Sequence, residues 1–325
     1  MKLESAGAQI KEAILREILP EALSLMNDVF GNYVIQKLLD FGTPEQRTEL
    51  ASLLCTNMLS LALQIYGCRV IQKALEVIDA PLQAKLISEL DGHVMRCVKD
   101  QNGNHVIQKC IERVATPMSQ FIVDAFMGQV SMLAKHPYGC RVIQRILEYG
   151  SAAQVDVVLT EIVASVTSLV QDQYANYVVQ HVLENGRTRD RAAIIQRLTP
   201  NVVSMSQHKF ASNVMEKCLE MGGAEERVAL ISQVIAKHDA FLAENGLTAT
   251  LGAAESEDVV DGGPQSPLEQ MMKDQYANYV VQKMLDISQG PQRDAMLARI
   301  RQYTPMLRKF MHGKHIIARI EKAAK

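Results

Sequence analysis

The sequence predicts an all-α solenoid built from three-helix repeats of ~36 residues. The nine residues DQYANYVVQ occur twice, at 172–180 and at 274–282. Variants of their last five residues recur in one register, with a block opening every 36 residues at Asn32, Cys68, Asn104, Cys140, Asn176 and Ser212. No strand-like alternation competes with this pattern. Solenoids repeat in this way because each unit must bury one face against its neighbours.

The period divides the chain into one array. Residues 1–19 are expected to be a partial first repeat, reduced to its last helix, and a C-terminal cap is expected at 304–325, with Lys314, His315 and Ala318 in the phase of the blocks. The full repeats are expected at 20–55, 56–91, 92–127, 128–163, 164–199 and 200–240, with the last at 268–303.

Each full repeat is expected to contain three helices. In the repeat at 56–91, a short helix near 57–63 leads into a second helix from Cys68 to about Val77, and a third helix follows. Hydroxyl side chains are placed to cap the starts of third helices at Thr43, Thr116 and Ser151. Proline follows the first two at the first helical position, and glutamine follows Thr43 and Ser151 three residues later.

Each block repeats polar and apolar residues at fixed positions. Positions three and four, from Val34 and Ile35 onward, are apolar and are expected to face the core, whereas positions one and five are four residues apart and are expected to share the unburied face. Position one is Asn32, Cys68, Asn104, Cys140, Asn176, Ser212 and Asn278, and position five is Gln36, Gln72, Gln108, Gln144, Gln180, Glu216 and Gln282. A single glutamine is usually an ordinary surface residue, but seven such groups in one phase indicate a row of hydrogen-bonding side chains.

Two further positions add groups that suit a nucleic acid. Position two is Tyr33, Arg69, His105, Arg141, Tyr177, Asn213 and Tyr279, and all of these except Asn213 have a planar group that can stack on a base. The residue after position five is Lys37, Lys73, Lys109, Arg145, His181, Lys217 and Lys283. Amides, stacking planes and cations, each once per repeat, are the groups that bind single-stranded nucleic acid.

These blocks resemble, in residue type, spacing and order, the repeats of the Pumilio (PUF) family of RNA-binding proteins, and the resemblance covers nearly the whole chain. It implies a right-handed superhelix of the Pumilio or armadillo-like kind, in which the second helices line the concave surface and each bind one base. It also implies a cytoplasmic protein that binds messenger RNA 3′ untranslated regions and lowers translation or stability by recruiting co-repressors such as a deadenylase complex. We expect a monomer.

The hydrogen-bonding groups indicate which bases are bound. Glu216 is an acceptor-only carboxylate, and guanine offers two adjacent donors, N1–H and N2–H, while the small Ser212 leaves room for a purine. Glutamine alone suits either uracil or adenine. The resemblance implies uracil for glutamine with asparagine and adenine for glutamine with cysteine, on RNA that runs antiparallel to the chain. The expected site is therefore 5′-UGUAUAU-3′, and a further 3′ base would fall to the helix that residues 1–19 lack.

Net charge and hydropathy limit how the protein can bind nucleic acid and indicate that it does not span a membrane. A net charge of −2 argues against nucleic-acid binding by bulk charge. However, the cations gather in one stripe, acidic residues are expected elsewhere, and fields act within roughly 8 to 10 Å. Binding is therefore expected to depend more on base contacts than on phosphate contacts. We expect no membrane segment, because the chain has no signal-peptide-like start and no apolar run approaching 18 residues.

No constellation of catalytic or metal-binding residues is evident. His136, His208 and His238 have no nucleophile or carboxylate at a diagnostic spacing, and there is no glycine-rich phosphate loop. The cysteines form no CxxC pair and no zinc-spaced cluster, so packing is the simplest interpretation of Cys55, Cys68, Cys97, Cys110, Cys140 and Cys218. We expect no enzymatic activity and no cofactor.

An acidic segment at 241–267 interrupts the array. It has no lysine or arginine, and it contains Gly262, Gly263, Pro264 and Pro267. This composition predicts a flexible loop, interpreted most simply as an insertion tolerated at a repeat junction. A docking site for a partner protein is the alternative.

Two other functions stay open at this point. One is a protein-binding scaffold of the HEAT or armadillo kind, and the other is a divergent PUF relative that acts on ribosomal RNA. The regularity of the block residues disfavours both, because degenerate residues would be expected there.

Overall fold

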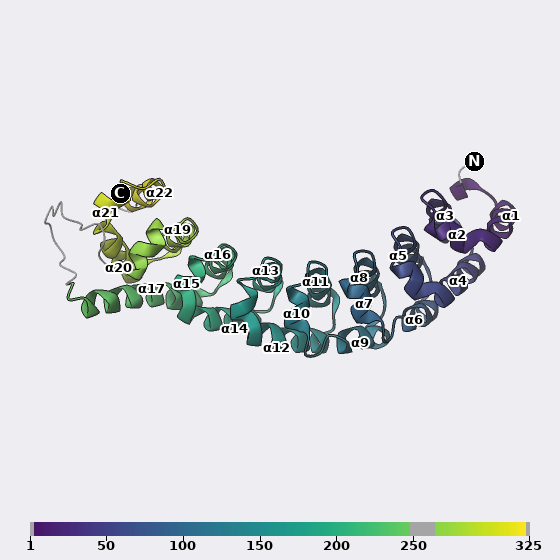
Figure 1. Ribbon diagram of the computed structural model, residues 1–325, viewed down its shortest axis with the longest axis horizontal. Coiled ribbons are helices and arrows are strands. Elements are labelled where there is room, and N and C mark those ends of the chain that lie inside the picture. The colour runs from purple at the N-terminus through teal and green to yellow at the C-terminus, as the bar shows by residue number, and fades with distance from the viewer. Residues whose placement is uncertain (1–2, 248–263, 323–325) are drawn as a thin grey trace. The chain divides into compact units, whose positions relative to one another are not determined.

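The computed structural model describes residues 3–247 and 264–322, and every regular element in these two ranges is a helix. The all-α prediction is therefore confirmed. The chain divides into two compact units, Met1–Glu161 and Ile162–Lys325, and the division falls inside one long helix, α12 (Ala152–Leu169) (Figure 1).

The first unit begins with η1 (Leu3–Ser5), α1 (Ala8–Ile18), η2 (Leu19–Glu21) and α2 (Ala22–Asn27). It continues with α3 (Gly31–Phe41), α4 (Pro44–Ala62), α5 (Gly67–Val77), α6 (Ala80–Ser88), α7 (Val94–Lys99), α8 (Gly103–Arg113), α9 (Thr116–Asp124), α10 (Val130–Ala134) and α11 (Gly139–Tyr149).

The second unit contains α13 (Ala175–Asn185), α14 (Thr188–Leu198), η3 (Thr199–Asn201), α15 (Val202–Ser206), α16 (Ala211–Met221) and α17 (Ala224–Glu244). After the segment outside the described residues it continues with α18 (Pro267–Lys273), α19 (Ala277–Ile287), α20 (Gly290–Arg301), α21 (Thr304–Leu307) and α22 (Gly313–Lys322).

The helices that carry the five-residue blocks, here called block helices, pack against one another in a row within each unit (Figure 1). In the first unit the row is α3, α5, α8 and α11, and in the second it is α13, α16, α19 and α22. Positions three and four of the blocks are buried, as expected, except that Val34 is 42% exposed. No block helix precedes α3 among the described residues, so this side of Val34 has no such neighbour.

At some repeat junctions, two helices that were expected to be separate form one continuous helix. In α4 and α12 the third helix of one repeat continues into the first helix of the next, which corrects the expectation of a separate helix near 57–63. These segments contain no internal glycine or proline that would stop a helix. Where the two helices stay separate, Gly92 and Gly128 adopt left-handed conformations with φ of 74° and 73°, which favour glycine.

Two of the three expected caps are present. Thr43 and Gln46 form a reciprocal capping box at the start of α4, and Ser151 and Gln154 exchange the same two hydrogen bonds before α12. The expectation for Thr116 is wrong, because α9 already begins at Thr116 and its cap residue is Ala115. Ser119 Oγ donates to the Thr116 carbonyl, so that residue lies inside the first turn.

By length and average apolar composition α12 would suffice to cross a membrane, although Gln154, Asp156 and Glu161 interrupt its apolar sequence. Its buried residues recur every three or four positions, at Val158, Ile162, Val166 and Leu169, which is the pattern of an amphipathic helix on a protein core. Its Glu161 accepts hydrogen bonds from two backbone N–H groups, those of Gly128 (2.7 Å) and Val130 (3.1 Å). We interpret α12 as a solenoid helix.

All six cysteines are buried and unbonded to one another. Burial raises the pKa of Cys97 to about 11, so this thiol stays protonated at neutral pH. These features agree with their interpretation as packing residues.

The acidic segment is shorter than expected at its start, because α17 continues to Glu244 and residues 241–244 are therefore helical. The central part of the predicted loop, 248–263, lies outside the described residues. At its other end Ser266 caps α18 by accepting a hydrogen bond from the N–H of Glu269 (3.2 Å).

Candidate nucleic-acid interface

Position two of each block faces solvent. Tyr33, Tyr177 and Tyr279 are 63%, 55% and 53% exposed, which is unusual for tyrosine on a folded protein. The same position is exposed in the other four block helices, at Arg69, His105, Arg141 and Asn213. A regular series of exposed planar groups is available to stack on bases.

Position one does not share this exposure, which corrects the expectation that positions one and five both lie on the unburied face. All seven residues are buried, and Asn32 and Asn278 are only 1% exposed. Position five is partly exposed in six blocks and buried in the seventh, at Gln282. Position one therefore supports position five from beneath.

The four blocks with asparagine and glutamine share one hydrogen-bonding pattern. In each, the glutamine Nε2 donates to the asparagine Oδ1 at 2.9 Å. The asparagine Nδ2 in turn donates at 2.8 Å to the carbonyl oxygen of the aspartate four residues before it. In Gln36, Gln108 and Gln180 this leaves Oε1 and one N–H of the amide without a partner within the described residues, and these groups can meet a base edge.

The blocks with cysteine place a smaller group under the glutamine. Gln72 Nε2 donates to the backbone carbonyl of Cys68 at 3.1 Å, because the thiol offers no comparable acceptor. Cys68 itself is 3% exposed. In the fourth block Gln144 Oε1 accepts from Arg141 Nη1 at 3.3 Å, and Cys140 lies 4% exposed beneath it.

The block with serine and glutamate is chemically distinct. Ser212 Oγ donates to the carbonyl of Lys209 at 3.4 Å, and the partly buried Glu216 carboxylate has no hydrogen-bond partner within the described residues. Burial raises the pKa of Glu216, and the nearby Lys283 opposes this effect. Glu216 is therefore a partly buried acceptor without a hydrogen-bond donor, which lowers the stability of the fold until a ligand supplies donors.

A cavity of about 450 Å³ joins the predicted site residues of neighbouring blocks in the first unit. It is lined by position two of three successive blocks, Tyr33, Arg69 and His105, and by position five of two, Gln36 and Gln72. Cys68 also lines it. The structure thus brings together hydrogen-bonding and planar groups from three helices in one hollow, within the size range of ligand sites.

The turn before each block helix contains residues that sequence reasoning missed. Asp28 Oδ1 accepts hydrogen bonds from the N–H groups of Phe30 (2.9 Å) and Gly31 (2.6 Å), and these bonds lower its pKa. The aspartates at 100, 172 and 274 make the same pair of bonds. These aspartates recur four residues before position one, and this recurrence in the sequence could have predicted the turn that they hold.

Histidine takes the place of this aspartate in two blocks. His136 Nδ1 accepts from the N–H groups of Tyr138 and Gly139 at 3.2 Å, and His208 makes the equivalent bonds to Phe210 and Ala211. Both histidines are therefore structural residues. His238 is fully buried, and its ring packs edge-on against that of Tyr303.

Most of the cations after position five are paired with carboxylates, so the expected stripe of positive charge, with acidic residues elsewhere, is wrong. Four of them each lie between the carboxylate three residues later on their own helix and the matching carboxylate of the preceding block helix: Lys73, Lys109, Arg145 and Lys217. In the first unit this series, here called the ion-pair ladder, runs Asp40, Lys73, Glu76, Lys109, Glu112, Arg145 and Glu148, with N–O distances of 2.5 to 3.2 Å.

The second unit continues the same arrangement through Glu184, Lys217, Glu220 and Lys283, and Arg319 pairs with Asp286. Hydrogen bonds from Lys283 and Lys217 lower the pKa of Glu220. Lys37 differs, because its ammonium lies over the ring of Phe41. The carboxylates recur with the same 36-residue period as the cations, so the ion-pair ladder could also have been predicted from the sequence.

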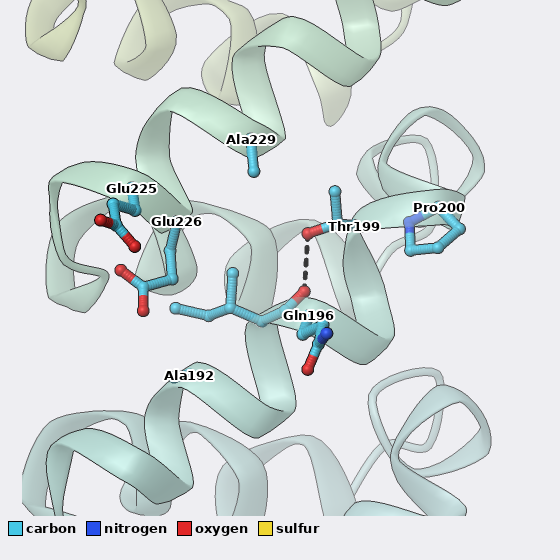
Figure 2. A pocket seen from close by; sticks show the side chains of 8 residues that line it. Ala192, Gln196, Thr199, Pro200, Glu225, Glu226 and Ala229 are labelled. Carbon is cyan, nitrogen blue, oxygen red and sulfur yellow. Dashed lines mark hydrogen bonds between the residues drawn. The ribbon is translucent and has the colours of Figure 1, made fainter.

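Another cavity, of about 370 Å³, lies away from the block residues, on α14, η3 and α17 (Figure 2). Glu225 and Glu226 line it together with Ile195 and Pro200, and Thr199 Oγ1 donates to the Ile195 carbonyl at 2.7 Å. It contains no predicted site residue and adds nothing to the interface of the block helices.

The model of a Pumilio-family RNA binding repeat matches seven stretches of the chain: 22–55, 57–90, 93–126, 129–163, 165–199, 201–235 and 269–301. Among curated proteins, Pumilio homolog 1 of Xenopus laevis is 52% identical over 63 residues, which are 19% of this chain and 5% of that protein. The maternal protein pumilio of Drosophila melanogaster is 56% identical over 52 residues, which are 16% of this chain and 3% of that protein. The matched segments are thus a small part of these relatives.

Solved structures match almost the whole chain. The crystal structure of PUF-8 in complex with PBE-RNA has a TM-score of 0.83 and 39% identity, covering 99% of this chain and 88% of that one. The Puf3 RNA binding domain bound to a Cox17 RNA 3′ UTR recognition sequence has a TM-score of 0.79 and 39% identity, covering 98% and 89%. With seven matching repeats in one all-helical solenoid, the chain belongs to the Pumilio family of RNA-binding proteins.

Proposed function

We propose that this chain binds single-stranded RNA in a sequence-specific manner, with one base for each block helix and 5′-UGUAUAU-3′ as its preferred site. The observation that carries the proposal is the order of three kinds of hydrogen-bonding pair along the block helices. From the N-terminus they are Asn–Gln, Cys–Gln, Asn–Gln, Cys–Gln, Asn–Gln, Ser–Glu and Asn–Gln. A nonspecific binder has no need for such an ordered series.

The Asn–Gln pairs are suited to uracil. With Nε2 anchored on the asparagine, the free Oε1 accepts from uracil N3–H, and the remaining amide N–H donates to a uracil carbonyl. Glu216 accepts from the N1–H and N2–H donors of guanine, and its ionised state makes both bonds charge-assisted. The small cysteines leave space for adenine, an assignment that follows the family resemblance.

The cellular role follows from the relatives. Structures of similar domains contain 3′ UTR recognition sequences, as in the Puf3 domain with Cox17 RNA. The proposed role is therefore binding to messenger RNA 3′ untranslated regions in the cytoplasm, where a bound monomer lowers translation or stability by recruiting a co-repressor such as a deadenylase complex.

Competition binding tests the proposed site. Labelled UGUAUAU is displaced by unlabelled UGUAUAU, by UUUAUAU and by a shuffled RNA of the same composition. We expect the shuffled RNA to compete on the order of 1,000-fold more weakly, as for specific against nonspecific sites. Equal competition by all three would overturn the assigned bases, and no binding to any RNA would favour the protein-binding scaffold.

A further inference from the structure

The last block helix before α22 contains a glutamine whose surroundings differ from the others. Gln282 is 6% exposed, whereas the six other position-five residues are partly exposed. Arg319 of α22 lies over it, and Arg319 Nη1 donates to Gln282 Oε1 at 2.6 Å. The same guanidinium donates through Nε to Asp286 Oδ1 at 2.9 Å.

Gln282 is consequently held at both ends of its amide. Its Nε2 donates to Asn278 Oδ1 at 2.9 Å, and Asn278 Nδ2 donates to the carbonyl of Asp274 at 2.8 Å. Exchanging the O and N of Gln282 would set its Nε2 against the guanidinium of Arg319 and its Oε1 against Asn278 Oδ1. Neither contact forms a hydrogen bond, because arginine has no acceptor and the asparagine Oδ1 has no proton.

The other three Asn–Gln pairs lack the second restraint. Gln36, Gln108 and Gln180 are each held by an asparagine through Nε2 alone. Arg319 follows Gln282 by 37 residues, and the residues at that separation from the other three glutamines pair with carboxylates instead. These pairs are Lys73 with Asp40 and Glu76, Arg145 with Glu112 and Glu148, and Lys217 with Glu184 and Glu220. Arg319 therefore gives Gln282 a second restraint that these three glutamines lack within the described residues.

We propose that Arg319 is a specificity-determining residue that positions the Gln282 amide and thereby rejects cytosine at the 5′ base of the site. The proposal rests on the proposed function. Uracil presents a donor at N3 and an acceptor at O4, whereas cytosine presents an acceptor at N3 and a donor at N4. A glutamine that turns over accommodates either pyrimidine, and one fixed in the observed orientation matches uracil. The second lone pair of Oε1 and the second N–H of Nε2 remain for the base.

The test compares RNAs that differ only at the first base, UGUAUAU and CGUAUAU. Arg319→Met keeps an apolar stem and removes the donors, so we expect the preference for uracil over cytosine at this base to fall by about 3- to 10-fold, the effect of one hydrogen bond. Arg319→Lys retains a donor and should recover part of the preference. Urea unfolding of both variants establishes that they fold.

The matched control is Arg145→Met, which removes the arginine at the same separation from Gln108 as Arg319 has from Gln282, and this arginine pairs with Glu112 and Glu148. Gln108 is assigned to the fifth base, so UGUAUAU is compared with UGUACAU, and this preference should not change. An unchanged first-base preference in Arg319→Met would overturn the proposal. Tighter binding of both first-base RNAs would also overturn it, because Arg319 would then block the base. Failure of the parent protein to prefer UGUAUAU over a shuffled RNA would instead refute the proposed function.

Discussion

Glu216 shows how burial affects a side chain that we propose to bind a base. Its carboxylate is partly buried and unpaired within the described residues, and burial raises its pKa against the opposing charge of Lys283. A raised pKa means that the folded protein binds this proton more tightly than the unfolded chain does. Burial of the ionised carboxylate therefore costs stability, and we expect the donors of a bound guanine to relieve that cost.

We expect RNA affinity to depend on pH through Glu216. The protonated carboxyl loses one of its two acceptor sites and its charge, so affinity for UGUAUAU should fall as the pH is lowered toward the raised pKa. The fall should begin at a higher pH than an ordinary glutamate would cause. Fluorescence anisotropy titrations from about pH 7.5 down to about pH 5 measure this effect, with urea unfolding at each pH to show that the protein remains folded.

The matched control for this prediction is the double substitution Ser212→Asn and Glu216→Gln, which recreates the Asn–Gln pair of the other blocks and removes the titrating group. Its preference should change from UGUAUAU to UUUAUAU by on the order of 10- to 100-fold, or roughly 1 to 3 kcal/mol for one base contact. Its affinity for UUUAUAU should lack the pH dependence assigned to Glu216. A double variant that still prefers guanine would contradict the role of both residues.

For single residues, the sequence predicted which positions share one side of the block helices but not how deeply each is buried. The 36-residue recurrence placed Tyr33 and Gln36 correctly on one side of the helix. It missed the burial of Asn32, because the asparagine amide bonds to the carbonyl of Asp28 in the preceding turn, and the path of that turn is a tertiary feature. Helical spacing alone indicates which residues share a face, not how far a neighbouring turn covers it.

Block helices are the elements that set the spacing of the site. Each begins at a turn held by an aspartate or histidine in six of the seven blocks, and the ion-pair ladder joins it to its neighbours. The ladder residues are only partly exposed: the side chains of Lys109 and Glu112 are 18% and 20% exposed. A network with shared partners loses less side-chain entropy per pair than isolated surface pairs do.

We expect Lys109→Met to lower the free energy of unfolding by about 0.5 to 1 kcal/mol, because a partly exposed pair is screened by solvent and Lys109 has two carboxylate partners. Urea denaturation followed by circular dichroism measures the change. Lys85→Met is the matched control, since Lys85 is an exposed lysine of α6 outside the ladder. Equal effects of the two substitutions would show that the ladder adds nothing to stability.

At the element scale the sequence predicted helices well and their boundaries less well. Capping residues located the starts of α4 and α12. The fusion of helices in α4 was missed, although the helix has no glycine or proline after Pro44, because continuation through a repeat junction depends on how neighbouring repeats pack. At two junctions where the helices stay separate, the sequence has a glycine, Gly92 or Gly128. The absence of a glycine at the junction in α4 could therefore have indicated the fused helix.

At the scale of the whole molecule, charge and family lead to one consistent picture. The net charge is −2, and yet the family binds a polyanion. The structure offers an explanation, because most cations next to the position-five residues are paired with carboxylates. We therefore still expect direct contacts with bases to contribute more to affinity than phosphate contacts do, although the acidic residues lie beside the cations and not elsewhere.

The dependence of RNA affinity on salt tests this picture for the whole molecule. Each phosphate of a single strand that a protein neutralises contributes about −0.7 to the slope of log Kobs against log salt concentration. Because the ladder cations are paired, we expect a slope shallower than about −2, which corresponds to fewer than about three neutralised phosphates.

Removing the ladder carboxylates should make that slope steeper. The double variant Glu76→Gln and Glu112→Gln leaves Lys109 without either partner, so its ammonium becomes available to a phosphate and the slope should steepen by about 0.7. Titrations of UGUAUAU at four salt concentrations, with parent and variant side by side, measure both slopes. A steep slope in the parent protein, near −5, would mean that phosphates displace the carboxylates from the ladder when RNA binds. The cations would then belong to the RNA interface after all, and the pairing seen without RNA would be the state from which binding must start.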